Sequence, residues 1–167
     1  NVIEINNYPL PEIEKITKGN RKIGLGVMGW AETMVKLGLA YDSTEGRAYA
    51  AAVTALMTGE AYRTSALISQ QMSPFEEFQK NRIPMLNVIY NHRFKMNKIS
   101  REYVPANLFD AAKQAWEDAV DLGTQHGFRN AQVTVLAPTG TIGFMMDCDT
   151  TGVEPDIALV KYKKLVG

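Results

Sequence analysis

The residues best suited to chemistry form a short turn, Pro138-Thr139-Gly140-Thr141-Ile142, between a β-branched stretch and an apolar one. We predict that this turn opens a helix, whose first backbone N–H groups lack partners and carry partial positive charge. A phosphate or diphosphate would satisfy both needs. Gly140 would let the backbone approach it closely, and Thr139 and Thr141 can donate hydroxyl hydrogen bonds. The simpler alternative, which the residue pattern alone favours, is that Thr139 only caps a short helix.

A second candidate is the glycine run of Gly24, Gly26 and Gly29, which matches the G-x-G-x-x-G dinucleotide fingerprint letter for letter. That chemistry needs a buried strand before the first glycine, so that the turn faces pyrophosphate. Arg21 and Lys22 stand there instead, whereas a central parallel strand should be almost continuously apolar. The pattern therefore favours close backbone packing, with an NAD(P)-dependent dehydrogenase kept as an alternative.

Acidic residues follow the Thr-rich turn, at Asp147, Asp149 and Glu154. Paired carboxylates can bind a divalent cation through oxygen. Acidic loop residues are more often solvated or capping, so we predict no metal site. Cys148 lies between two of them without a visible group that would activate its thiol, and we predict a structural or incidental role for it.

The composition is that of an ordinary globular protein of 167 residues, with 46% hydrophobic and 22% charged residues. Eighteen basic and eighteen acidic residues give a net charge of zero, which argues against a broad nucleic-acid surface. A single cysteine excludes an internal disulfide and indicates a reducing cytoplasm. No apolar run approaches the roughly 18 residues of a membrane span. Because the chain lacks an initiator Met, we expect it to be a piece of a longer protein.

The elements that must position these residues are predicted to be mostly helical. The clearest signal is an apolar stripe from Leu108 to Val120 at helical spacing. A β-branched run at 132–136 predicts a strand. Asp42, followed by Glu45, resembles a capping box for a long helix. Other helices are predicted at residues 11–19, 28–38, 42–72, 84–92 and 142–146, and after Pro155.

Several stretches resemble the large chain of ribonucleotide reductases. Residues 20–31 resemble one stretch of that chain, and residues 130–142 resemble its substrate-phosphate loop. The segment 152–155, Gly-Val-Glu-Pro, follows that loop at the family's spacing. The longer segment 146–156 is similar to the adenosylcobalamin-dependent class. The resemblance covers residues 1–167, which implies a single segment from the C-terminal part of the catalytic barrel domain.

The resemblance implies both a fold and an activity. The fold would be α/β, a mostly helical fragment with a few short strands from the ten-stranded barrel of these enzymes. The activity would be radical-based reduction of ribonucleoside di- or triphosphates to deoxyribonucleotides for DNA synthesis, with adenosylcobalamin as the cofactor. The residues implied to bind substrate phosphate are Pro138, Thr139, Gly140, Thr141 and Ile142.

The sequence departs from the family in one respect. The family's Asn-x-Cys-x-Glu catalytic motif is absent, and Cys148 does not occupy a family catalytic position. We therefore predict no catalytic residue in this chain and no reduction by the chain alone. We expect the chain to pair with the rest of the reductase chain or to associate with itself, because strand edges cut from a barrel are left unpaired. A noncatalytic subunit that completes a split barrel is a third alternative.

Overall fold

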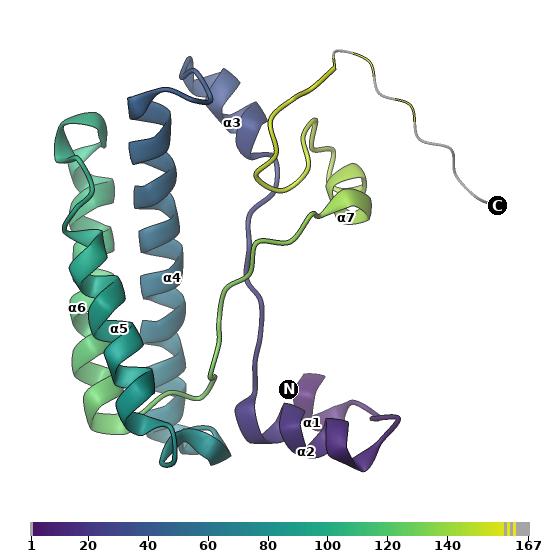
Figure 1. Cartoon of the computed structure of the whole chain (residues 1–167), viewed down its shortest axis with the longest axis vertical. Helices are drawn as coiled ribbons and strands as arrows, with labels where there is room; N and C mark the ends of the chain where they lie inside the picture. Colours follow the sequence, from purple (N-terminus) through teal and green to yellow (C-terminus); the bar gives the residue numbers. More distant parts are fainter. Residues whose placement is uncertain (1, 159, 161, 163–167) are drawn as a thin grey trace. The chain divides into compact units, whose positions relative to one another are not determined.

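The computed structural model describes residues 2–158, 160 and 162 of the chain. Two compact units make up the structure, residues 1–25 with 47–135 and residues 26–46 with 136–167. Helices dominate both units (Figure 1). In chain order they are α1 (Val2–Ile5), α2 (Pro11–Asn20), α3 (Trp30–Leu37), α4 (Thr44–Met72), η1 (Glu76–Phe78), α5 (Arg82–Met96), η2 (Arg101–Tyr103), α6 (Ala106–His126) and α7 (Gly140–Met145).

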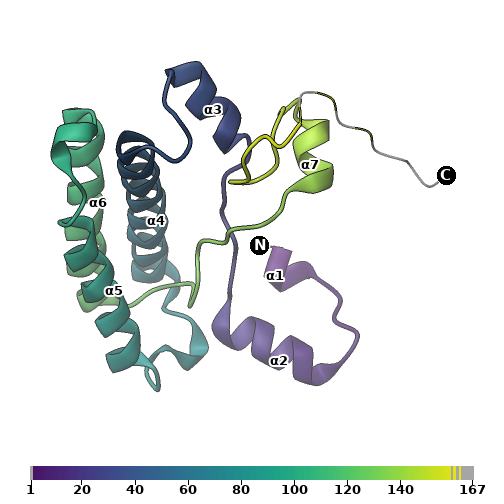
Figure 2. The same ribbon diagram turned by 45° about the horizontal axis from the view of Figure 1, so that its top comes forward.

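The first unit is built on α4, α5 and α6, which run side by side in alternating directions (Figures 1 and 2). The predicted stripe on α6 forms much of its core, because Ala112, Trp116 and Ala119 are almost completely buried. Ala111, at the edge of the stripe, is exposed. The helical periodicity therefore predicted both this helix and the side that packs. In the described part of the chain, no helix has the length and apolarity to cross a bilayer.

One end of this core is a cluster of aromatic rings around Phe128. Its side chain is fully buried and meets Tyr62 edge-on, with ring centroids 5.5 Å apart and planes at 76°. The Phe128 ring also lies directly against Gly123 of α6, where a Cβ would come within 2.0 Å of its Cζ. Glycine is unfavourable inside a helix, but here it makes room for the ring.

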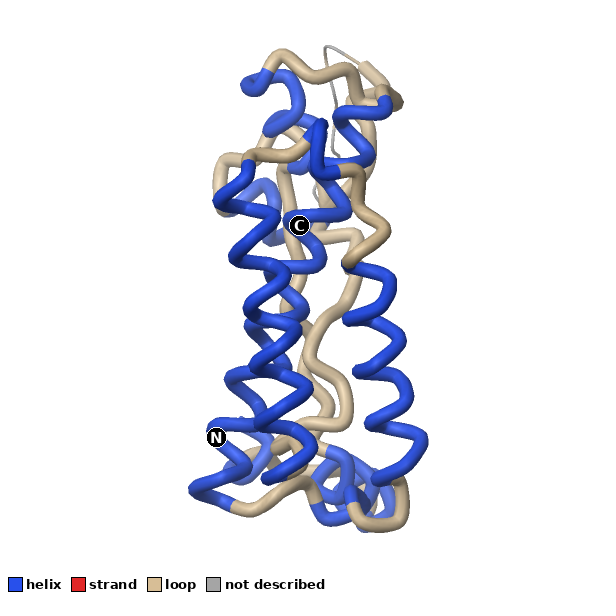
Figure 3. The backbone as a smooth tube through the Cα atoms, turned by 90° about the vertical axis from the view of Figure 1, so that its left-hand side faces the viewer, coloured by secondary structure: helices blue, strands red, loops and turns tan. Residues whose placement is uncertain are grey.

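The prediction of an α/β fold with a strand at 132–136 is wrong. No strand occurs among the described residues (Figure 3). Residues 132–136 are extended, and the Leu25 N–H donates to Val133 O at 2.9 Å while the Val135 N–H donates to Leu25 O at 2.9 Å. This pairing amounts to one isolated parallel bridge, between Leu25 and Thr134.

The physical reason for this correction is that two extended segments do not make a parallel sheet. Parallel sheets are stable when both faces are covered and neighbouring strands extend the ladder. Here Leu25 is 50% exposed, and the pairing has no third segment among the described residues. The β-branched composition of 132–136 predicted the extended backbone correctly, but not the absence of partners.

Two of the predicted helix starts, at Asp42 and after Pro155, also differ in the structure. Ser43, rather than Asp42, caps α4, because the Ser43 hydroxyl oxygen accepts the Gly46 N–H at 2.9 Å. Ser43 stands directly before the first helical residue, which is the position from which a side chain reaches the third amide. The helix predicted after Pro155 does not begin within 155–158, and most of the remainder lies outside the described residues.

Candidate functional site

The turn at 138–142 leads into α7, as predicted. Thr139 adopts a left-handed backbone conformation, with φ 54° and ψ 29°, and the Gly143 N–H donates to its carbonyl at 2.8 Å. Among the described residues, no acceptor is present for the backbone N–H groups of Gly140, Thr141 and Ile142. Thr141 and Ile142 are exposed. The start of α7 therefore presents three successive unbonded amides at the surface, the donor arrangement that suits an oxyanion.

The hydroxyl of Thr139 does not cap its own helix. Its Oγ1 instead accepts the backbone N–H of Gly152 at 2.6 Å, so the simple capping alternative is wrong. A β-branched residue at positive φ is a conformational outlier. The bond to Gly152 holds Thr139 in this conformation. The hydroxyl proton stays available for donation, because only a lone pair of the oxygen is used.

Gly152 holds the turn from the other side. Its φ is +51°, and a Cβ there would lie 2.8 Å from the Ala137 carbonyl oxygen and 3.3 Å from that of Pro138. Its own carbonyl accepts the N–H of Trp30, at the start of α3, at 3.2 Å. A glycine is therefore required at 152, both by its backbone conformation and by its contact with the turn.

Gly140 is a different case. A Cβ at this position would meet no atom within 4 Å, and the backbone is not in the left-handed region. The protein's own packing therefore does not require glycine at 140. Open space in front of its Cα leaves the neighbouring amides accessible to a ligand.

The glycine run at 24–29 has the packing role that its sequence context favoured. A Cβ on Gly24 would lie 2.7 Å from Cγ1 of Val135, so the two extended segments approach more closely than a side chain would allow. Gly29 is left-handed, with φ +70°, and faces Cys148, whose Sγ would lie 3.4 Å from an added Cβ. Helix α3 begins directly after Gly29.

The dinucleotide alternative for this run is wrong. A pyrophosphate would need free amides where the glycine run enters α3. The Gly29 N–H donates to Thr150 O at 3.2 Å, the Trp30 N–H donates to Gly152 O, and the Glu32 N–H points to Thr150 Oγ1 at 3.4 Å. The run is also preceded by α2 rather than by a strand.

Comparison with known proteins shows the family of this chain. The family model described as "Ribonucleotide reductase, barrel domain" matches residues 1–167. The chain belongs to this ribonucleotide reductase family. The predicted family membership is thereby confirmed, although the described residues of this reductase segment form helices and no strand.

Relatives with curated names resemble this reductase segment closely. Vitamin B12-dependent ribonucleotide reductases from Bradyrhizobium diazoefficiens and Rhodopirellula baltica are each 45% identical to it over 99% of the chain. The enzyme of the same name from Agrobacterium fabrum is 46% identical over 96% of the chain. The segment spans 15%, 16% and 14% of the length of these three proteins.

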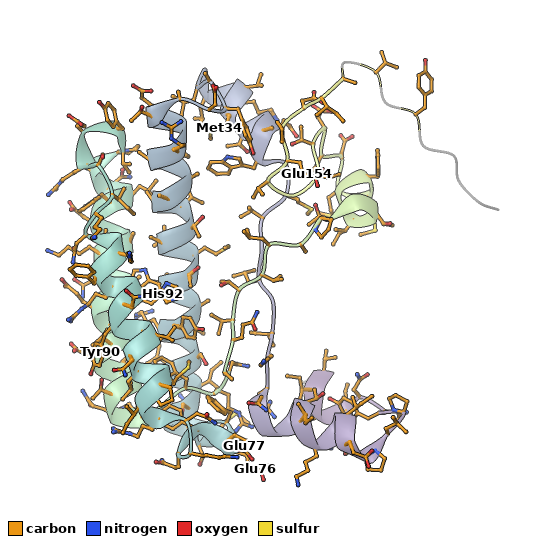
Figure 4. All side chains as sticks on the ribbon, in the orientation of Figure 1. Met34, Glu76, Glu77, Tyr90, His92 and Glu154 are labelled. Carbon is orange, nitrogen blue, oxygen red and sulfur yellow. The ribbon has the colours of Figure 1, made fainter. Side chains whose placement is uncertain are left out.

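In the reductase segment, hydrogen bonds connect the loop at 147–154 to α3 and to α7. Glu32 on α3 accepts the Asp149 N–H at 3.1 Å, and the Cys148 N–H donates to Gly143 O at 2.9 Å. Glu154, labelled in Figure 4, accepts the Thr151 hydroxyl at 3.1 Å. These bonds fix the loop that carries Gly152, and through Gly152 they fix the turn at 138–142.

The sequence did not indicate these supporting residues. Its pattern predicted Asp149 and Glu154 only as solvated or capping residues, and it carried no signal for Glu32. The available signal was Gly152 itself, because a glycine at a defined distance after a tight turn often marks a close backbone approach. Among the described residues, no group of three or more His, Cys, Asp or Glu side chains could hold a metal ion.

We expect this loop to loosen in acid. The hydrogen bond from Lys36 and the Asp149 N–H lower the pKa of Glu32 below its usual value of 4.5. A carboxylate with a lowered pKa stabilises the folded state above its unfolded-state pKa, and that contribution disappears as the pH falls through the lowered value. Hydrogen exchange of the Asp149 amide should therefore accelerate below about pH 4.5.

The matched variant for this prediction is Glu32→Gln, which retains an acceptor oxygen but not the charge. Its Asp149 amide should show no acceleration below about pH 4.5, after correction for intrinsic exchange. An acid-induced acceleration of the same size in Glu32→Gln would contradict the assignment to this carboxylate.

Proposed function

We propose that this chain is the substrate-phosphate-binding segment of a vitamin B12-dependent ribonucleotide reductase. The observation that carries the proposal is the row of three unbonded amides at Gly140, Thr141 and Ile142, beside open space at Gly140. Membership of the reductase family supplies the ligand class, a ribonucleotide, and we propose that it binds as the di- or triphosphate.

The turn would bind the phosphates by directed hydrogen bonds. Backbone amides are fixed donors that need little rearrangement when they bind an anion, and the partial positive charge of the helix start adds to their effect. Thr139 can donate its free hydroxyl proton while its oxygen stays bonded to Gly152, and exposed Thr141 can donate as well. Pro138 fixes the backbone that enters the turn.

Phosphate binding of this kind would position the substrate for chemistry carried out by residues in the rest of the reductase chain. Anchoring the phosphates at the turn limits where the ribose can lie, and correct placement of a substrate can account for a large part of a rate enhancement. We assign no catalytic residue to this chain, and we expect it to show no turnover without the rest of the reductase chain.

Adenosylcobalamin is the cofactor that we propose for the whole enzyme, where it would generate the radical. We assign it no contact among the described residues. The sole cysteine, Cys148, has its Sγ 4.0 Å from the Met146 carbonyl oxygen, and no His, Cys, Asp or Glu cluster forms around it among these residues. The lone thiol supports a reducing, cytoplasmic location.

Gly140→Ala in the full-length reductase tests the proposal. The added methyl group would occupy the open space in front of the amides, so the KM for the ribonucleotide should rise about tenfold or more, the equivalent of one lost charged hydrogen bond. Stability should change by less than about 0.5 kcal/mol, because the methyl group meets no protein atom.

The matched control is Gly143→Ala, one turn further along α7. Its Cβ would meet Cγ2 of Thr151 at 3.8 Å and Oγ1 of Thr139 at 3.9 Å, both ordinary contacts, and its own N–H is already bonded to the Thr139 carbonyl. The KM of this variant should stay at the wild-type value. An unchanged KM in Gly140→Ala would sink the assignment of the phosphate site to this turn.

A further inference from the structure

We propose that Arg21 and Arg129 form a separate oxyanion site, which the Glu4 carboxylate fills in this structure and which a free phosphate group can take over by releasing α1. The residues all belong to the first unit. The site is therefore distinct from the turn at 138–142, and the inference does not rest on the proposed function.

Both guanidinium groups converge on one carboxylate oxygen. Arg21 Nη1 donates a hydrogen bond to Oε1 of Glu4, and Arg129 Nη2 lies 3.8 Å from the same oxygen. The arginine side chains are only 10% and 17% exposed, whereas that of Glu4 is 50% exposed. Two largely buried cations thus share one half-exposed anion, which leaves an excess of positive charge.

This excess charge is visible in the electrostatics of Arg129. Burial, and then the neighbouring charge of Arg21, lower the pKa of its guanidinium. In Arg21, the Nε atom is buried and lacks a hydrogen-bond partner, so one donor of the cluster is unused. A buried cationic cluster of this kind is stable only with an anion bound to it.

The backbone of Arg21 and the side chain of Arg129 are held independently of Glu4. The backbone carbonyl of Arg21 accepts the buried amide of Asn130 at 2.7 Å. Arg129 Nη1 donates to the carbonyls of Met72 and Ser73, at the end of α4, at 3.1 and 3.2 Å. Because these bonds do not involve α1, the Arg21 backbone and the Arg129 guanidinium stay in place when the carboxylate leaves.

The element that carries Glu4 is, by contrast, weakly attached. Helix α1 has four residues and buries none of them, and the side chains of Val2 and Ile5 are 70% and 80% exposed. A helix this short is not stable by itself. Beside the ion pairs and its contacts with α2, α1 is attached by the Tyr8 hydroxyl, which donates to Ile3 O at 2.8 Å. The Glu4 ion pairs are therefore a main tether, and a competing anion can replace them.

The chemistry of the cluster favours a phosphate group. Guanidinium forks match phosphate oxygens, and a group with more than one negative charge neutralises two arginines better than one carboxylate does. Inorganic phosphate and the phosphate of a nucleotide share this chemistry. Titration of each, in separate arms, distinguishes the two sources.

Glu4→Gln in the full chain is the direct test. With the competing charge removed, calorimetry at constant ionic strength should show inorganic phosphate binding about tenfold more tightly than it binds the unaltered chain. Equal gains for inorganic phosphate and a nucleoside monophosphate would identify the phosphate group itself as the ligand. A larger gain for the nucleotide would indicate added contacts at the same site.

The control is Glu14→Gln, which removes the same charge from the nearby Lys18 pair without touching either arginine. It should not change phosphate affinity. Adding Arg21→Lys to Glu4→Gln should abolish the gain in phosphate affinity, with circular dichroism as the check that the double variant is folded. If that variant does not fold, Arg129→Lys in the Glu4→Gln background takes its place. Equal affinity in Glu4→Gln and the unaltered chain, or an equal gain in Glu14→Gln, would overturn the proposal.

Discussion

Replacing Gly123 with alanine is expected to destabilise the chain by about 2 kcal/mol, against the usual gain of about 1 kcal/mol for Gly→Ala within a helix. An added Cβ would lie 2.0 Å from Cζ of Phe128 and less than 3 Å from two more ring atoms. The ring is fully buried and meets Tyr62 edge-on, so it cannot rotate away without disturbing the cluster. Overpacking therefore outweighs the improved helix propensity.

Urea unfolding followed by circular dichroism would measure this effect. Gly19→Ala is the matched control, because Gly19 is also helical but its Cβ would meet only Cγ of Glu77, at 3.5 Å. That variant should be as stable as the wild type or slightly more stable. Phe128→Leu should partly relieve the penalty of Gly123→Ala, so the double variant should be less destabilised than the sum of the singles. Strict additivity would show that the ring is not the cause.

The second large effect is expected from Gly152→Ala. A Cβ at 152 would clash with the carbonyl oxygens of Ala137 and Pro138, and φ of +51° would itself cost an alanine about 1–2 kcal/mol. Displacement of residue 152 would also break the hydrogen bond that holds Thr139. If the turn at 138–142 binds substrate phosphate, misplacing its amides by about 1 Å should raise the KM of the full-length reductase by up to about a hundredfold.

Gly38→Ala separates the effect of backbone strain from the effect of displacing the turn. Its φ is +68°, but a Cβ there would meet nothing within 4 Å. It should therefore lose similar stability from backbone strain while leaving the KM unchanged. Thermal unfolding and steady-state kinetics of both variants would decide the matter. Equal KM values in the two variants would show that Gly152 supports the fold and not the substrate site.

Local patterns in the sequence predicted a good deal of this protein. The periodicity of α6 identified its buried side, and Pro138, Thr139 and Gly140 marked the turn before α7. Charged residues before Gly24 correctly argued against a dinucleotide site. These features depend on groups within about four residues of one another, so composition and spacing are sufficient to predict them.

Contacts between distant residues decided the rest. The acceptor role of Thr139 depends on Gly152, thirteen residues away, and the amides of Trp30 and Glu32 are bonded to that same loop. The β-branched run at 132–136 determined an extended backbone, but only the tertiary structure decided that it would pair with one segment and form no sheet. Such hydrogen bonds join groups far apart in the chain, so their partners are set by packing and cannot be derived from local propensity.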